Sequence, residues 1–328
     1  MTAKKAYSRM GFLYLVFSLA VLVVQLILSY VLYRYYPALY DSYSFLMIVS
    51  SLSLYGTGLL ILPFGAGKLV REKTVPEKHS MKFSELLQAF CVTYLIVIVS
   101  NLVGQLIIGL LETFLGGAVV NPVDDLVENL SPLLLFVLTG LIAPAFEEWF
   151  FRKILVDRLL AYGEAAAILA SGLMFGLFHG NLDQFFYAFA IGSFFAYIYI
   201  RTGKLRYVML LHGMLNVFSS VFLSQLLELV NLDAFYAAAT DTMELMRYCL
   251  ENPVEISALA IAEGAAYCIM IAGLIFVIRG RKRFFLKPQA QQPSDGGQMK
   301  TALLNAGMIC YVVYSVIYII VETVMEMV

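Results

Sequence analysis

The sequence predicts an all-α, polytopic transmembrane helix bundle of about nine spanning helices, with the N-terminus in the cytoplasm. Of its 328 residues, 61% are hydrophobic and only 14% are charged, and the mean hydropathy is +0.83. Soluble domains are typically about 45–50% apolar and about 25% charged. The apolar residues also gather in long runs, and a spanning helix needs about 20 of them. The chain is therefore expected to be a multi-pass integral membrane protein in contact with lipids.

Nine apolar stretches are long enough to be interpreted as spanning helices. They cover residues 11–33, 43–64, 84–111, 131–160, 164–181, 183–202, 205–226, 254–278 and 301–321. The first is expected to be a retained helix and not a signal peptide, because its apolar run is too long and no small-residue cleavage site follows it. Residues 284–300 resemble a flexible linker, so the last helix is expected to be appended to the bundle.

Lysine and arginine residues fall in alternate loops, and this distribution sets the expected orientation. With the N-terminus in the cytoplasm, twenty of the 22 lie on the cytoplasmic side or at its edge, and only Arg34 and Arg247 do not. The opposite loops carry carboxylates instead, namely Asp124, Asp125, Glu128, Asp233, Asp241 and Glu251. Lys and Arg are enriched in cytoplasmic loops. A count of nine helices places nearly all of these residues on that one side, so the pattern agrees with it.

The chain divides into three parts in this interpretation. Residues 1–130 hold the first three helices, 131–226 hold a core of four helices with the polar motifs, and 227–328 hold an outer loop, a helix, the linker and the last helix. The four cysteines show no CxxC and are interpreted as small buried hydrophobes. No basic, aromatic-rich domain lies outside the apolar segments, so a nucleic-acid partner is not expected.

The first polar motif is E147-E-W-F-F-R152. Glu148 and Arg152 are four residues apart on a helix, with the acid first, which favours an ion pair. Glu147 lies about 100° around the helix and is free to face another helix. Pro144 removes one backbone hydrogen bond and is expected to kink the helix there. The alternative is a charge cluster at a helix end, but carboxylates at membrane depth usually mark a pathway or a reaction site.

Two further motifs place a histidine on the face of a helix. Phe175 and His179 share one face, and His212 and Asn216 share another. Taken alone, either histidine is equally well explained as a structural hydrogen-bonding group between helices. Small residues four apart, at positions 172, 176 and 180 and at 188, 192 and 196, predict close packing of the two helices that carry them.

The three motifs are predicted to lie at a similar depth in the membrane. At a rise of about 1.5 Å per residue, Glu147 and His179 each lie about 20 Å from the turn between their helices, and Asn216 lies about 18 Å from Lys204. His212 lies one turn shallower. We therefore expect the four side chains to converge in one polar cavity within hydrogen-bond or single-water reach, and we expect this cavity to open toward the cytoplasm.

A carboxylate with two imidazoles at membrane depth is suited to activating water. A desolvated carboxylate is a better base, one imidazole can position the water, and the other imidazole and an amide can donate to an oxyanion. The same carboxylate and histidines, Glu147, His179 and His212, are alternatively ligands for a divalent metal such as zinc. The residues suffice for hydrolysis with a metal or without one.

The three motifs in this order resemble those of the CPBP family, the CAAX proteases and bacteriocin-processing enzymes that are also called the Abi family. The resemblance covers about residues 131–222. It implies a type II CAAX prenyl endopeptidase-like intramembrane protease of a bacterial cell membrane, glutamate- or metal-dependent, with a membrane-bound, prenylated or amphipathic peptide as substrate. By the same resemblance, Glu147 and His179 activate water and His212 and Asn216 stabilise the oxyanion. Supporting roles fall to Glu148, Arg152 and Phe175.

A different class of function stays open at this stage. The chain could be a non-catalytic membrane protein, either a proton-coupled transporter or a binding protein that confers bacteriocin immunity. Glu263, with Asn101 and Gln105 in the third apolar stretch, supports a transporter, because a proton path needs intramembrane acids. The gathering of Glu147 with two histidines at one depth favours the protease.

Overall fold

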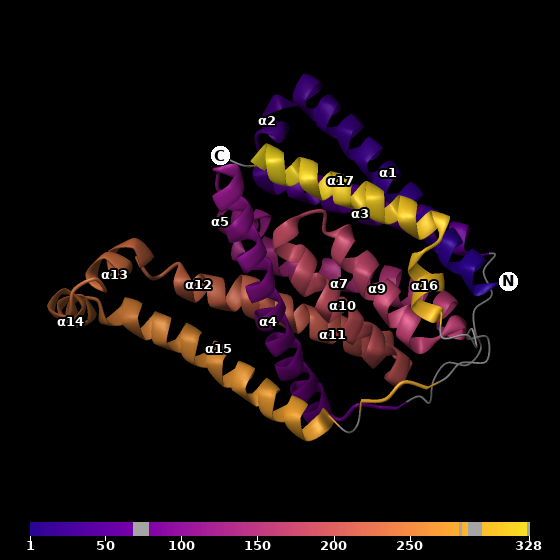
Figure 1. The fold of residues 1–328 in the computed structure, drawn as a ribbon. Coiled ribbons are helices and arrows are strands. Elements are labelled where there is room, and N and C mark those ends of the chain that lie inside the picture. The colour runs from indigo at the N-terminus through magenta and orange to yellow at the C-terminus, as the bar shows by residue number, and fades with distance from the viewer. Residues whose placement is uncertain (68–78, 282–283, 288–296, 327–328) are drawn as a thin grey trace.

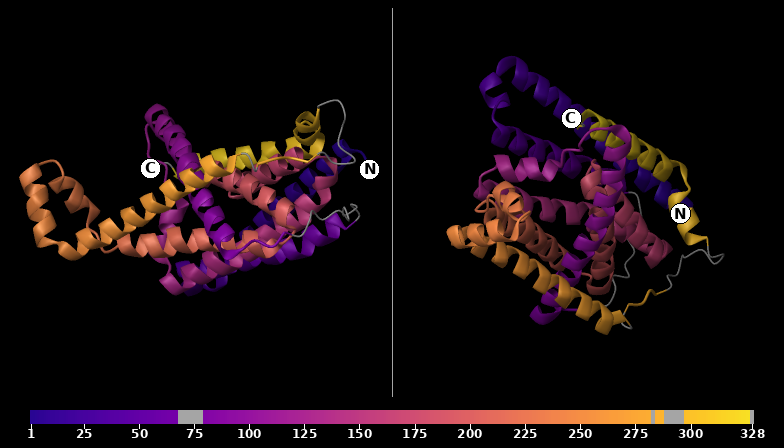
Figure 2. Two further views of the ribbon diagram at one scale, coloured as in Figure 1. Left: turned by 90° about the horizontal axis from the view of Figure 1, so that it is seen from below. Right: turned by 60° about the vertical axis from the view of Figure 1, so that its left-hand side comes forward.

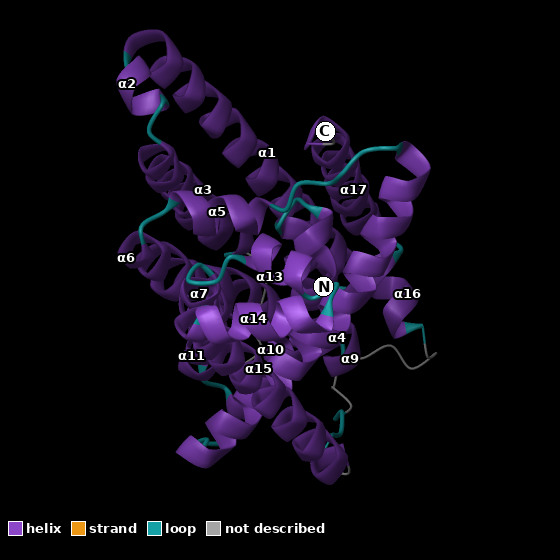
Figure 3. Cartoon of the chain, turned by 90° about the vertical axis from the view of Figure 1, so that its left-hand side faces the viewer, coloured by secondary structure: helices purple, strands orange, loops and turns teal. Residues whose placement is uncertain are grey.

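The computed structural model describes residues 1–67, 79–281, 284–287 and 297–326, and within these it contains helices and no strand (Figures 1 and 3). Eight helices in these ranges are long and apolar enough to cross a membrane. They are α1 (Ala3–Tyr35), α3 (Tyr43–Ala66), α4 (Phe83–Leu115), an interrupted helix over 132–162, α10 (Leu182–Thr202), a second interrupted helix over 205–227, α15 (Pro253–Gly280) and α17 (Ala306–Glu326). The predicted all-α fold of a multi-pass integral membrane protein is confirmed.

Each of the nine predicted stretches contains a helix, but the fifth and the last differ from expectation. The fifth is α9 (Glu164–Phe178), whose 15 residues fall short of the about 20 that a spanning helix needs. The last stretch is divided into α16 (Gln298–Leu303) and α17. Four short helices occupy the loops, namely α2 (Pro37–Tyr40), α5 (Pro122–Asn129), α13 (Leu232–Ala238) and α14 (Thr242–Glu251).

The two ends of the bundle differ in charge, with Lys4, Lys82, Lys204 and Arg279 at helix ends on one side and Asp124, Asp125, Asp233 and Asp241 in or beside short helices on the other. At the end that we call the basic end, an ion pair between Arg201 and Glu164 joins the end of α10 to the start of α9. The opposite end, which we call the acidic end, holds α2, α5, α13 and α14, and the last two project beyond the other helices (Figure 2). Some residues expected at the basic end, Lys68, Arg71, Lys73, Lys78, Lys282 and Arg283, lie outside the described residues.

The helix over 132–162 is irregular where it carries the first motif. Its order is α6 (Pro132–Leu135), η1 (Phe136–Ile142), α7 (Ala143–Glu148), η2 (Trp149–Val156), α8 (Asp157–Leu159) and η3 (Leu160–Tyr162), and η1 and η2 are π-helical. Pro144 has no N–H to return to the preceding turn. The disturbance expected at Pro144 thus takes the form of a π-helical stretch that ends two residues before it. Such widened turns are often found at functional sites.

The close packing predicted for α9 and α10 is confirmed. A methyl group built on Gly172 would lie 2.0 Å from the Ser193 hydroxyl, and one on Gly176 would lie 2.9 Å from the Phe185 carbonyl oxygen. These separations leave no room for a side chain. The backbones of α9 and α10 are therefore in direct contact, and this contact fixes the end of α9 against the start of α10.

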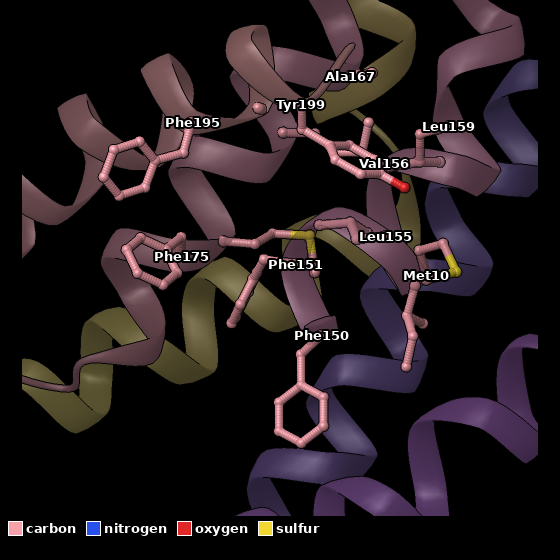
Figure 4. Packing of buried hydrophobic residues seen from close by; sticks show 14 of the residues in the cluster. Met10, Phe150, Phe151, Leu155, Val156, Leu159, Ala167, Phe175, Phe195 and Tyr199 are labelled. Carbon is pink, nitrogen blue, oxygen red and sulfur yellow. The ribbon is translucent and has the colours of Figure 1, made fainter. Parts of the chain in front are cut away.

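Aromatic side chains form the centre of the bundle. Phe150 and Phe151 from η2 and Phe175 from α9 are fully buried, together with Phe195 from α10 and Met10 from α1 (Figure 4). Lipid is as apolar as these side chains, so packing, and not removal from water, holds membrane helices together. Phe150, Phe151 and Phe175 belong to the first two motifs, so this cluster packs around the segments that carry Glu147 and His179.

The last helix is not peripheral to this cluster. Figure 1 shows α17 lying along α1. The Tyr311 hydroxyl donates to the Met174 carbonyl of α9 at 3.1 Å. A methyl group on Gly307 would lie 1.7 Å from the Ser8 carbonyl oxygen. The helix that was expected to be appended thus packs tightly on both α1 and α9.

Candidate active site

Glu147 is a buried carboxylate whose two oxygens face different partners. It lies near the end of α7 and is 8% exposed. The Tyr55 hydroxyl, from α3, donates to Glu147 Oε1 at 3.1 Å. Glu147 Oε2 lies 4.0 Å from Nε2 of His212. One oxygen is thus held in place and the other is directed toward the third motif.

Glu148 is the charged centre of the site. Its side chain and that of Arg152 are both 0% exposed, and Arg152 Nε lies 2.9 Å from Glu148 Oε2. The pairing expected from their spacing is present. Arg152 also donates to the Ser171 hydroxyl at 2.7 Å, and its guanidinium lies 5.0 Å from the centre of the Phe175 ring. These contacts join the first motif to α9.

His212 stands between the two glutamates. It lies in α11 (Leu205–Asn216), the first part of the helix over 205–227, which continues as the π-helical η4 (Val217–Leu223) and α12 (Ser224–Leu227). Its Nδ1 lies 3.1 Å from Glu148 Oε1. A carboxylate can only accept a hydrogen bond, so this contact places a proton on Nδ1 and directs Nε2 toward Glu147.

His179 reaches the site from the end of α9. It directly follows the last helical residue, and its Nδ1 lies 2.8 Å from the Phe175 carbonyl oxygen. A carbonyl oxygen only accepts, so Nδ1 carries the proton and Nε2 of the neutral ring is a free acceptor. The Phe175 ring lies between the two imidazoles, at 4.8 Å from His179 and 5.9 Å from His212. His179 is close enough to interact electrostatically with both Glu147 and His212.

Asn216 lies one helical turn beyond His212. Its Nδ2 donates to the Thr139 carbonyl oxygen of η1 at 2.8 Å. Its side chain also lines a cavity of about 430 Å³, together with Thr139, Tyr187 and Ser219. Of the four residues predicted to converge, the structure thus brings Glu147 and His212 into direct proximity. It places His179 and Asn216 at the edges of this pair, each beside a different cavity.

Sequence reasoning missed two polar partners of the site. Tyr55 lies in an apolar stretch, and nothing in its spacing separates it from the other tyrosines among the 21 in the chain. Ser171 is eight residues before His179, and its link to Arg152 depends on how α9 meets the helix over 132–162. Only the packing of helices identifies these two residues.

The geometry does not suit a metal ion. A catalytic zinc needs three protein ligands. Among the described residues, no group of three or more His, Cys, Asp or Glu side chains is arranged to hold a metal ion. In His179 and His212, Nδ1 bonds to Phe175 and Glu148, so Nε2 is the only ring nitrogen of each that is available as a ligand. The set Glu147, His179 and His212 therefore does not fit a metal site in this arrangement, and we derive no step through one.

Comparison with known proteins points to the same segment of the chain. Residues 129–218 match the family model described as type II CAAX prenyl endopeptidase Rce1-like. A similar protein, "Putative membrane peptidase YdiL" of Bacillus subtilis (strain 168), is 31% identical over 86 residues, which cover 26% of this chain and 35% of that protein. The match thus spans little more than a third of the relative's length. No solved structure matches the chain.

The matched segment runs from Asn129, the last residue of α5, to the second residue of η4. It contains the four predicted catalytic residues, Glu147, His179, His212 and Asn216. Tyr55 and the helices α1, α3, α15 and α17 lie outside it. Residues 129–218 of this membrane protein are therefore similar to the Rce1-like domain of type II CAAX prenyl endopeptidases, and we call them the Rce1-like domain.

Proposed function

We propose that this protein is an intramembrane endopeptidase that hydrolyses a peptide bond in a membrane-associated or lipidated protein or peptide. The observation that carries the proposal is the arrangement of Glu147, a buried carboxylate with one oxygen held by Tyr55 and the other 4.0 Å from His212. The Rce1-like family match and the relative described as a membrane peptidase support the same class of reaction.

Glu147 acts as the general base in this proposal. Its Oε1 is occupied by the Tyr55 hydroxyl, so Oε2 is the oxygen that accepts a proton from water. His179 positions that water, because its unprotonated Nε2 can accept the water's second hydrogen. General bases of this kind typically contribute about 10²–10⁴-fold to the rate.

His212 and Asn216 form the oxyanion site. Because Nδ1 of His212 donates to Glu148, an Nε2–H that donates to the oxyanion requires a doubly protonated ring. The imidazolium and Arg152 then balance the charges of Glu147 and Glu148, which suits a cluster at membrane depth. Asn216 uses one amide hydrogen on Thr139 and retains a second for the oxyanion.

The reaction balances without a further reactant. The water oxygen attacks the carbonyl carbon of the peptide bond while Glu147 accepts one water proton. His212 and Asn216 donate to the resulting oxyanion. Glu147 then passes its proton to the amide nitrogen as the carbon–nitrogen bond breaks, which yields a carboxylic acid and an amine.

The test uses the full-length protein in lipid nanodiscs with prenylated and amphipathic reporter peptides. Glu147→Gln keeps the shape of the side chain and removes the base, so kcat should fall by at least about 100-fold while the protein stays folded. Glu263→Gln is the control, since Glu263 is an exposed acid on α15 outside the site. Cleavage that survives Glu147→Gln would contradict the proposal, and selective damage by Glu263→Gln in a transport assay would favour a transporter.

The same cleavage assay is repeated in the presence of a divalent-metal chelator. The donor groups of Glu147, His179 and His212 do not form a metal site in this arrangement, so cleavage should continue in the presence of a divalent-metal chelator. Loss of cleavage that zinc alone restores would require the three side chains to rearrange around an ion, and would replace water activation by Glu147 with metal chemistry.

A further inference from the structure

A polar cavity penetrates the bundle from the acidic end. It has a volume of about 430 Å³, and twelve of its twenty lining side chains are polar. These polar side chains come from five segments: α4, α5 with the residue before it, η1, the start of α10, and the helix over 205–227. They are Asn101, Gln105, Asn121, Asp124, Thr139, Asp183, Gln184, Tyr187, Asn216, Ser219, Ser220 and Ser224. A single buried water needs about 10–15 Å³, so the cavity has room for many.

Several polar side chains of the lining bond within the protein and keep further hydrogen-bonding capacity unused. Gln105 donates to only one oxygen of Asp183, at 3.2 Å. Ser219 and Ser224 return their hydroxyl hydrogens to their own helix. Carboxamides and carboxylates have further donors and acceptors to satisfy. At membrane depth an unsatisfied polar group costs several kcal/mol, so this remaining capacity favours water inside the cavity.

The inner wall of the cavity touches the candidate active site. Asn216 belongs to both, and it lies about 6 Å along the helix axis from His212. A second cavity of about 220 Å³, lined by Gln25 and Ser315, includes His179 in its lining. Each cavity thus contains one predicted site residue, Asn216 or His179.

We propose that the cavity lined by Asn216 is the water-filled passage through which Glu147 receives the water consumed in hydrolysis, and that it opens at the acidic end of the bundle. This inference rests on the proposed function. It differs from the expectation that the site opens toward the cytoplasm, because in the expected orientation the acidic end faces the opposite side. Asp124 and Asp183 make the passage negative, and no Lys or Arg lines it.

The experiment measures the reactivity of single cysteines in the full-length protein, in sealed vesicles and in a background without the four native cysteines. Ser219→Cys and Ser224→Cys probe the passage. Phe222→Cys is the matched control, because Phe222 lies between them along the chain and lines an apolar groove instead. Restored Cys249 on α14 marks the acidic end, and Ser80→Cys, beside Lys204, marks the basic end.

We expect a membrane-impermeant thiol reagent to modify Ser219→Cys and Ser224→Cys from the side on which Cys249 reacts, and to leave Phe222→Cys unmodified. A cationic reagent should react faster than an anionic one of equal size, since the lining is negative. Modification of Ser219→Cys should then block most of the cleavage, while modification of Cys249 should not.

The outcome is independent of the test of the proposed function. The proposed passage would be wrong if Ser219→Cys and Ser224→Cys react only from the side of Ser80→Cys, or react no faster than Phe222→Cys. This holds even if Glu147→Gln abolishes cleavage. Conversely, reaction from the side of Cys249 together with unchanged cleavage by Glu147→Gln would leave a hydrated cavity in place and remove the proposed function.

Discussion

At the scale of single residues, the two adjacent glutamates have different surroundings. Glu148 is completely buried and is shared by Arg152 and His212, at 2.9 Å and 3.1 Å. Among the described residues, Glu147 has no ion-pair partner apart from His212 at 4.0 Å, and it accepts a hydrogen bond from the hydroxyl of Tyr55. This difference leads us to assign the structural charge to Glu148 and the proton transfer to Glu147.

Glu148→Gln tests this division. The substitution leaves Arg152 and His212 facing a neutral amide, and breaking a buried ion pair from one side typically costs about 3–5 kcal/mol. We expect a clear drop in the thermal unfolding temperature, with loss of cleavage as a consequence. Glu147→Gln should retain nearly the unfolding temperature of the unmodified protein. Equal losses of stability in the two variants would show that the division is wrong.

Tyr55→Phe removes one hydroxyl and nothing else from the site. Without its donor, Glu147 is free to rotate away from the water, so kcat should fall about tenfold with little change in KM. Losing one hydrogen bond should cost about 1 kcal/mol of stability. Tyr311→Phe is the matched control, because its buried hydroxyl bonds to the Met174 carbonyl and not to the site. If both variants lose the same activity, Tyr55 has a structural role only.

At the scale of elements, the site depends on how closely α11 approaches the helix over 132–162. A methyl group built on Gly213 would lie 2.7 Å from the Gly140 carbonyl oxygen of η1. Gly213 directly follows His212, and Asn216 bonds to Thr139, the residue before Gly140. The π-helical stretch of η1 and the glycine on α11 therefore set the distance between the third motif and the first.

Gly213→Ala should separate these two elements. The added methyl group meets backbone that cannot rotate away, and overpacking of this kind costs about 1–3 kcal/mol. We expect a large loss of cleavage activity with only a moderate drop in the unfolding temperature, because His212 and Asn216 are both displaced from the first motif. Gly264→Ala on α15 is the control, since the space around it is open and alanine favours a helix. Activity of Gly213→Ala equal to that of this control would contradict the close approach.

At the scale of the whole molecule, helices outside the Rce1-like domain support it. From α3, Tyr55 reaches Glu147, and from α1 Tyr14 donates to the Phe150 carbonyl at 2.7 Å. On the other side of α1, α17 covers both α1 and α9, and Gly307 lies directly against Ser8. The N-terminal and C-terminal helices thus close one side of the bundle around the domain.

Gly307→Ala should open this contact. The methyl group would lie 1.7 Å from the Ser8 carbonyl oxygen, so α17 has to move away from α1. We expect a lower thermal unfolding temperature and faster proteolysis of the chain at its C-terminal helix. Gly109→Ala on α4 serves as the control, as nothing lies within 4 Å of the added group. An unchanged unfolding temperature would mean that α17 does not hold the bundle together.

The sequence by itself determined the helical fold, the positions of the long apolar helices, the pairing of Glu148 with Arg152 and the close packing of α9 on α10. These features follow from local spacing, since hydropathy, a four-residue interval and rows of small residues act within one helix or between neighbours in the chain. The similarity of residues 129–218 to the family follows equally from motifs in the sequence. The catalytic roles of Glu147, His179, His212 and Asn216 stay predictions.

Only the tertiary structure decided which helix faces meet. It brought Tyr55 to Glu147 from 92 positions away and Tyr311 to Met174 from 137 positions away, and no spacing rule reaches that far. It placed His212 between the two glutamates, and it gathered polar side chains of five segments around one cavity that includes Asn216. The physical reason is that helix rotation and depth are set by packing among all the helices together, whereas the sequence pattern records the preferences of each helix alone.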